Sequence, residues 1–132
     1  MKYLGFFLVI FLVSCGDPKE KEIQMLSDEA IAVHDEVMPM MDKLYVMRTG
    51  IQKRVQEDST LLTDELAATL VELKEAEDAM WNWMRNFNLQ YEGENQDSTI
   101  AYFTRKKSSA EIMADQMKKA MIMGEETMKT FE

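Results

Sequence analysis

Apolar side chains in this chain recur at alternating steps of four and three residues, and this spacing constrains the fold most strongly. Such steps bring side chains to one face of an α-helix and are typical of helices that pack as coiled coils. Three runs of this kind, which we call seams, are separated by polar segments. The second extends from Leu62 to Phe87, and the third from Thr99 to Phe131. The first consists of Ala30, His34, Val37, Met41, Leu44, Arg48, Ile51 and Val55.

The runs and their connections predict an all-α fold, an antiparallel up-down-up three-helix bundle. The polar turn at 56–60 and the loop at 88–97 are short, and short connections make consecutive helices antiparallel neighbours. We expect the first helix to begin at Ser27, because a serine hydroxyl can accept a hydrogen bond from the free N–H groups of a helix start. Pro39 should kink this helix without ending it, since the seam keeps its phase across the proline.

The same spacing predicts which residues face each other across the bundle. It places His34 beside Trp83 and Lys106 near Met80. Because burying an unpartnered charge is costly, we expect Arg48 and Lys106 to lie at the seam edge with their heads in water, or to fix the register of the helices. A functional buried ion pair is the alternative.

The composition excludes some partners and agrees with the helical prediction. The chain has a formal net charge of −9, with five glycines and two prolines among 132 residues. An acidic surface repels nucleic acid, and it lacks the basic face that a peripheral amphipathic helix needs. We therefore expect no nucleic-acid binding. The scarcity of glycine and proline favours helices, and the length suits one domain.

The first residues have the organisation of a bacterial export signal. Lys2 supplies a basic start, and an apolar run follows over residues 4–13. This run is too short to span a bilayer, which takes about 20 apolar residues. Residues 12–15, Leu-Val-Ser-Cys, resemble the lipobox that lipoprotein-processing enzymes cut before its cysteine.

Cys15 is the one cysteine of the chain, so no disulfide can form within it. Resemblance to bacterial lipoproteins implies a diacylglyceryl thioether on Cys15 and usually an acylated amine, which together anchor a protein stably in a membrane. The alternatives are a secretory signal with Cys15 as a chance neighbour, or a stop-transfer anchor, which the polar tract 16–22 disfavours. Because Gly16 and not aspartate follows, we expect the outer membrane and leave the leaflet open. The predicted parts are a signal peptide over 1–14, a lipidated flexible tether over 15–26 and a helical bundle domain over 27–132.

The single histidine, His34, begins a segment rich in methionine. Met38 lies one helical turn after His34, and Met41 follows on the next turn. An imidazole with soft thioethers suits Cu(I), and a His/Met pair can also ligate haem iron. A periplasmic copper or haem carrier that uses these three residues is therefore one hypothesis. The alternative is that methionines fill the core as flexible hydrophobic side chains and that His34 packs against Trp83.

Two tryptophans mark the end of the second predicted helix. Trp81 and Trp83 are two residues apart and cannot face the same side of a helix. We expect one to enter the core and the other to be partly exposed near Met84. An exposed tryptophan beside a methionine can bind a protein, so Trp81 and Met84 are candidate partner-binding residues. The alternative is that the long loop covers this end of the bundle.

Residues with catalytic chemistry are few. The chain has no second histidine and no glycine-rich phosphate loop, and acidic residues such as Glu72, Glu75, Glu77 and Asp78 are predicted on solvated helix faces. We therefore expect no enzyme and no cofactor beyond the covalent lipid. The leading hypothesis is a lipid-anchored, non-enzymatic binding or scaffolding module with an envelope protein as partner. Besides the metal carrier, a chaperone-like or stress-sensing bundle is an alternative, because methionine-rich surfaces bind varied clients.

Two segments carry a resemblance to a known group of proteins. Residues 34–41, His-Asp-Glu-Val-Met-Pro-Met-Met, and residues 80–87, Met-Trp-Asn-Trp-Met-Arg-Asn-Phe, follow the lipobox in the order seen in small envelope lipoproteins of Bacteroidota. Some of these carry the label "viral A-type inclusion protein", which reflects coiled-coil similarity. The resemblance implies a helical envelope lipoprotein of unknown function and supplies no catalytic residues.

Overall fold

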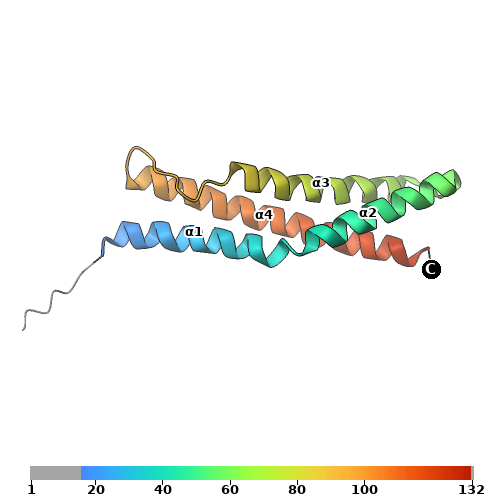
Figure 1. The fold of residues 1–132 in the computed structure, drawn as a ribbon, viewed down its shortest axis with the longest axis horizontal. Coiled ribbons are helices and arrows are strands. Elements are labelled where there is room, and N and C mark those ends of the chain that lie inside the picture. The colour runs from blue at the N-terminus through green and yellow to red at the C-terminus, as the bar shows by residue number, and fades with distance from the viewer. Residues whose placement is uncertain (1–15, 132) are drawn as a thin grey trace, which may run out of the picture.

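The computed structural model describes residues 16–131, and this part of the chain is all-helical, as the sequence predicts (Figure 1). The helices are α1 (Pro18–Val37), α2 (Met40–Glu57), the short 3-10 helix η1 (Ser59–Leu61), α3 (Asp64–Asn86) and α4 (Gln96–Lys129). Within residues 16–131, none of them is long and apolar enough to cross a membrane. The predicted signal peptide and Cys15 lie outside the described residues.

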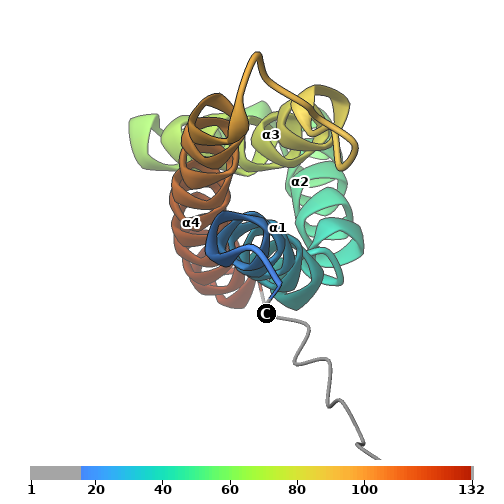
Figure 2. The same ribbon diagram turned by 90° about the vertical axis from the view of Figure 1, so that its left-hand side faces the viewer.

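The helices pack into one elongated bundle in which α4 contacts each of the other three α-helices. α1 and α2 follow one another along the bundle, and α1 packs on α4 while α2 packs on both α3 and α4. Two ion pairs, Glu29–Lys107 and Glu36–Lys118, bridge α1 and α4. α1 makes few contacts with α3, and the view along the bundle in Figure 2 shows these two helices apart, each beside α4.

α1 begins at Pro18 and not at Ser27, so the predicted flexible tether over 15–26 is wrong from residue 18 onward. The carboxylate of Asp17 caps the helix by accepting a hydrogen bond from the Lys19 N–H at 3.0 Å. Proline suits the first helical position, where its missing N–H would have no partner. The earlier start extends the seam backwards in the same steps, from Ala30 to Ser27 and then to Ile23.

The long first helix of the sequence prediction is interrupted at Met38 and Pro39, so the prediction of a kink without a break is wrong. Proline lacks the N–H that would continue the helical ladder. The Met41 N–H donates instead to the Met38 carbonyl at 3.1 Å, a tighter turn. Both interrupting residues keep right-handed helical backbone angles, and the seam therefore continues through fully buried Val37 and Leu44.

The predicted seams form the core of the bundle. Leu62, predicted to open the second seam, is an exception and is 52% exposed, because it precedes Thr63, which caps α3 by accepting from the Leu66 N–H at 3.2 Å. Burying each large apolar side chain stabilises the fold by about 1.5–3 kcal/mol. The buried seam residues are Ala30, Val37, Leu44, Ile51, Leu66, Thr69, Leu73, Ala76, Met80, Trp83, Thr99, Phe103, Ala110, Met113, Met117, Ala120 and Gly124.

The register of α4 on α3 differs from the prediction by about one turn. The Trp83 indole N–H donates to the Lys106 carbonyl at 3.1 Å, so Lys106 lies opposite Trp83 and not opposite Met80. A buried indole N–H needs an acceptor, and this register supplies one. In the same register, Phe87, the residue directly after α3, packs edge to face on Phe103 of α4.

Candidate functional site

Aromatic side chains form a continuous stack near the loop that follows α3. The His34 ring lies on Trp83 with a centroid distance of 5.3 Å, which confirms the predicted neighbours, and Trp83 lies on Phe87 at 4.7 Å. Phe87 meets Phe103 edge to face at 6.2 Å, and Phe103 meets Tyr102 at 5.1 Å. The stack joins α1, α3 and α4 and gives this end of the bundle a rigid interior.

The three predicted metal ligands lie on both sides of the helix break. His34 is in α1, Met38 is exposed at the break, and Met41 is half-buried in α2. The His34 Nδ1 lies 2.8 Å from a carboxylate oxygen of Asp35, and Nε2 is buried with no hydrogen-bond partner within residues 16–131. The described residues contain no group of three His, Cys, Asp or Glu side chains that could hold a metal. Metal or haem binding therefore stays a prediction.

The two tryptophans face opposite ways, as the sequence predicts. Trp83 is buried in the core, whereas Trp81 is half-exposed on the outer face of α3. Met84 is half-buried and packs against the core from the edge. The role of Trp81 and Met84 in binding a partner stays a prediction.

Arg48 of α2 and Glu77 of α3 form an ion pair that is largely buried, so the Arg48 head does not lie in water at the seam edge, and a function of the pair stays a prediction. The side chains are 19% and 12% exposed. The prediction that Glu77 lies on a solvated face is therefore wrong. Hydrogen bonding to Glu77 raises the pKa of Arg48, so the guanidinium stays charged. Since the two charges match each other, the pair holds α2 on α3 and leaves no charge free for chemistry.

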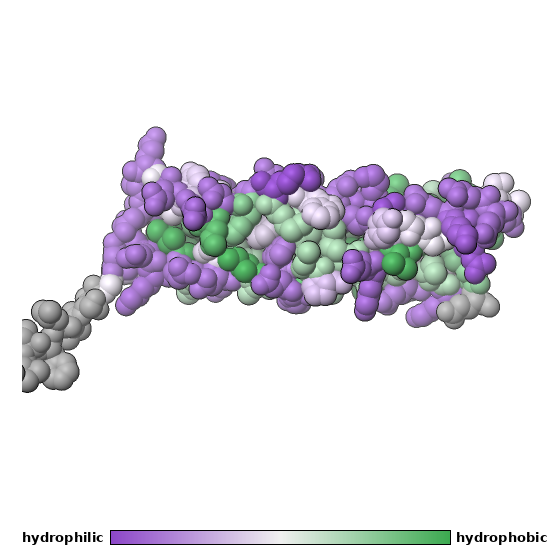
Figure 3. All heavy atoms as spheres, viewed as in Figure 1, coloured by the Kyte–Doolittle hydropathy of each residue, from purple (hydrophilic) through white to green (hydrophobic). Residues whose placement is uncertain are grey.

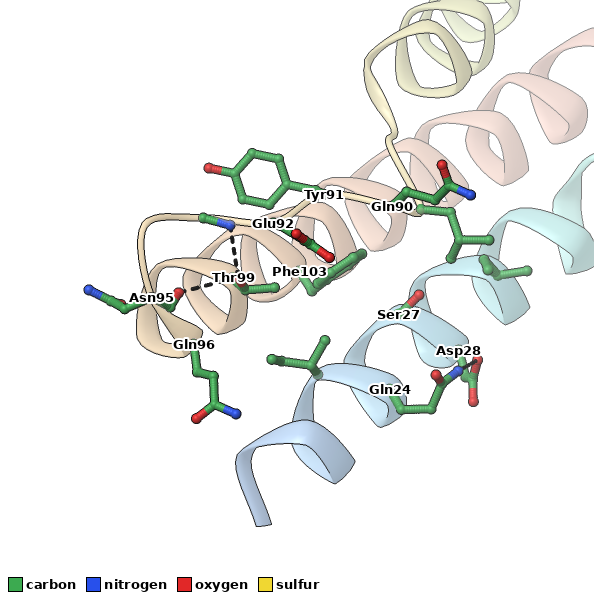
Figure 4. A pocket seen from close by; sticks show the side chains of 14 residues that line it. Gln24, Ser27, Asp28, Gln90, Tyr91, Glu92, Asn95, Gln96, Thr99 and Phe103 are labelled. Carbon is green, nitrogen blue, oxygen red and sulfur yellow. Dashed lines mark hydrogen bonds between the residues drawn. The ribbon is translucent and has the colours of Figure 1, made fainter. Parts of the chain in front are cut away.

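A cleft of about 1000 Å³ opens between α1, the loop after α3 and the first turns of α4 (Figure 4). Its apolar surface comes from Ile23, Ile31 and Leu89, with the buried Phe103 beneath them, and polar side chains of the loop and of α1 surround this surface. The volume lies at the upper end of the range for sites that bind small organic molecules. Figure 3 shows hydrophobic residues gathered along one face of the same end of the bundle.

Ser27 of α1 lines this cleft and is only 3% exposed. Its hydroxyl has no hydrogen-bond partner within residues 16–131. A buried hydroxyl without a partner costs about 1–3 kcal/mol, and serine is also a poorer helix former than alanine. Packing alone therefore does not account for a serine at this position in the wall of the cleft.

The loop that walls the cleft is pinned to α4. The Tyr91 ring stacks on Tyr102 at a centroid distance of 3.9 Å. The Gly93 N–H donates to the Thr99 hydroxyl at 2.9 Å, which brings the backbones of the loop and α4 close together. A Cβ on Gly93 would lie 2.6 Å from the Ser98 Cβ, so this approach requires glycine. The wall is thus preformed.

The first turns of α1 and α4 are tied together next to the cleft. Lys19 forms an ion pair with Asp97 at 2.8 Å, and the Gln96 amide donates to the Asp17 carboxylate at 2.6 Å. The hydrogen bond from Gln96 is the main cause that holds the pKa of Asp17 below its ordinary value of 3.8, and the hydrogen bond from the Lys19 N–H adds to it. Bonding to Asp97 raises the pKa of Lys19. These exposed contacts join the starts of the two helices beside the cleft.

Sequence reasoning missed this cleft, because one end of its α1 wall was predicted to be a tether and a second wall was predicted to be a loop. One signal could have revealed the α1 wall. The four-and-three spacing of the first seam continues backwards through Ser27 to Ile23, which places a small polar residue on a buried face.

No protein-family model, curated protein or solved structure matches the chain. The resemblance to Bacteroidota lipoproteins therefore stays a prediction, and function is inferred from the cleft and from the N-terminal sequence.

Proposed function

We propose that this protein is a lipid-anchored binding module of the bacterial cell envelope, held in the outer membrane by lipid on Cys15 and acting without catalysis. The cleft beside Ser27 is the observation that carries the binding role. Its apolar surface can bury a ligand, and its wall is pinned before any ligand arrives, which reduces the entropy lost on binding. The export signal and the lipobox support the anchor.

In this proposal the bundle has an up-down-up arrangement, with α1 and α2 together as its first arm. The bridges Glu29–Lys107 and Glu36–Lys118 support it, because they join α1 and α4 in the same order along both helices. The hydrogen bond between Trp83 and Lys106 and that between Thr69 and Thr127 join α3 and α4 in opposite orders.

The binding role is tested with the neutral apolar dye Nile red and a chain of residues 16–132, since the whole described core lies within it. We expect one dye per chain, detected by a rise in dye fluorescence. Leu89→Ser should weaken dye binding at least fivefold, because Leu89 lines the cleft. The matched control is Ile122→Ser, which changes a side chain of similar exposure on the far part of α4 and should leave binding intact. Equal loss in both variants, or no dye binding, contradicts the role.

The anchor is tested by expressing the full chain in a bacterium that processes lipoproteins and supplying a clickable palmitate analogue. Label should enter the wild type and the Ser14→Ala variant, which keeps a small residue before the cut. Cys15→Ser should carry no label and should leave the membrane fraction. Label that persists in Cys15→Ser excludes the anchor.

A copper or haem carrier is the second candidate, and the unpartnered His34 Nε2 favours it. Metal-binding histidines commonly donate their other ring N–H to a carboxylate, as the 2.8 Å contact of Nδ1 with Asp35 allows. Titration of residues 16–132 with Cu(I) and with haem tests this candidate, followed by tryptophan fluorescence and absorbance. Binding at one equivalent that disappears in both His34→Ala and Met38→Leu supports it. Binding that is absent, or unchanged in both variants, excludes it.

A further inference from the structure

We propose that the cleft takes an amphipathic amine, whose ammonium head lies between Glu92 and Ser27 and whose apolar body lies on Ile23 and Leu89. This inference rests on the proposed function, because it names the chemical class of ligand for the same cleft.

The charge of the cleft favours a cation. The lining side chains that carry a charge at neutral pH are Asp28 and Glu92, both acidic, and no lysine or arginine of residues 16–131 lines the cleft. Asp28 already accepts a hydrogen bond from the Gln24 amide at 2.7 Å. Glu92 has no ion-pair partner in the described part of the chain. A carboxylate or phosphate ligand would meet repulsion here, whereas an ammonium would gain a partner.

The head position combines two oxygen-bearing side chains that suit an ammonium. Figure 4 shows the Glu92 carboxylate and the Ser27 hydroxyl near the Phe103 ring, reaching it from the loop and from α1. An ammonium has up to three N–H donors and no acceptor, so it can donate to both oxygens at once. The buried Ser27 hydroxyl, 3% exposed and unpartnered, would gain the hydrogen bond that it lacks within residues 16–131.

The rest of the cleft suits an alkyl or aryl body. Ile23 and Ile31 approach from α1, and Leu89 approaches from the loop with 56% of its surface exposed. A ligand body would cover Leu89 and remove apolar surface from water. Each added methylene on the body should therefore tighten binding by up to about fourfold until the cleft is filled.

The test compares three ligands that share an octyl chain and differ only in the head: octylammonium, octanol and nonanoate. Each displaces Nile red from residues 16–132 at pH 7. We expect octylammonium to bind at least tenfold more tightly than octanol, and nonanoate to bind most weakly. Glu92→Gln should bring octylammonium to the level of octanol. The matched control is Glu94→Gln, because Glu94 is exposed on the same loop and does not line the cleft.

A second variant tests the hydroxyl. Ser27→Ala should weaken octylammonium binding several-fold while the helical circular dichroism stays unchanged. Equal affinities for octylammonium and octanol in the wild type would overturn the amine proposal, as would a preference that survives Glu92→Gln. Nile red binding would then still support the proposed binding role. If Nile red does not bind and octylammonium gives no heat on calorimetric titration, both proposals fail.

Discussion

The guanidinium of Arg48 donates two hydrogen bonds to the carboxylate of Glu77, with Nε 2.6 Å from Oε1 and Nη2 3.0 Å from Oε2. Arg48→Met removes one partner and leaves the carboxylate with little water around it. Because a largely buried charge without a partner is costly, we expect the free energy of unfolding to fall by about 2–4 kcal/mol. Urea denaturation followed by circular dichroism measures the change.

The double variant Arg48→Met with Glu77→Leu removes both charges and keeps side chains of similar size. It therefore distinguishes the cost of one unpartnered charge from the contribution of the whole ion pair. Replacing both partners with apolar side chains of similar size leaves no charge buried, so most of the lost stability should return. Lys119→Met is the control, since it breaks an ion pair with Glu72 in which the lysine is 61% exposed, and it should cost at most about 1 kcal/mol. A double variant as unstable as Arg48→Met would show that the pair is essential to the packing of α2.

Ser27→Ala should make the protein more stable, even though it removes a polar group from the proposed site. Alanine is the better helix former, and the substitution deletes a buried hydroxyl that has no partner within residues 16–131. We expect a gain of about 1–3 kcal/mol in the free energy of unfolding, measured by thermal and urea denaturation. Ser109→Ala, on the exposed face of α4, should change stability by less than about 0.5 kcal/mol. A loss of stability in Ser27→Ala would mean that the hydroxyl supports the fold.

Two glycines should respond to alanine in opposite ways. At Gly93 the new Cβ would lie 2.6 Å from the Ser98 Cβ and 3.1 Å from backbone, so the loop must move. We expect Gly93→Ala to lower stability by about 1–3 kcal/mol and to weaken Nile red binding. At Gly50, within α2, the nearest side-chain atom is 3.8 Å away, and alanine should stabilise the helix by up to about 1 kcal/mol. Similar effects at both positions would contradict a close approach of the loop to α4.

The bond between Asp17 and Gln96 predicts a specific loss of stability in acid. The folded state holds the pKa of Asp17 below 3.8, so the carboxylate stabilises the fold above that pH and loses this effect as the pH falls through the lower folded value. The difference in unfolding free energy between wild type and Asp17→Asn should therefore be full at pH 6 and shrink below about pH 3.8. Urea denaturation at a series of pH values measures it. A difference that stays constant down to pH 2.5 contradicts the link.

The core could be predicted from the sequence because one periodic pattern encodes it. Positions such as Leu44, Leu73 and Met117 recur at steps of four and three, and each is fully buried. The approach of His34 to Trp83 also followed from this spacing. Helix ends were harder to predict than buried positions, because a single residue can determine where a helix begins or ends. Asp17 caps α1 and Pro39 interrupts the first seam, and a seam that keeps its phase indicates neither event.

The cleft could not be predicted, because it depends on contacts that no local pattern encodes. Tyr91 meets Tyr102 only after the loop has turned back on α4, and Gln96 reaches Asp17 across 79 positions of sequence. The partner of Arg48 was missed for a related reason. Glu77 lies among other acidic residues in the sequence, as is typical of a solvated helix face. Only the approach of α2 to α3 buries it.

The start of α1 at Pro18, three residues after Cys15, limits how far the domain can stand from an anchor. Three residues span at most about 11 Å, and Ile23 lies roughly 8 Å further along the helix. Anchored through Cys15, the cleft would therefore open within about 20 Å of the lipid attachment, against the headgroup layer. A molecule that partitions into that layer would reach the cleft by lateral diffusion in two dimensions. Its abundance in the leaflet, and not in bulk water, would then set how often the cleft is filled.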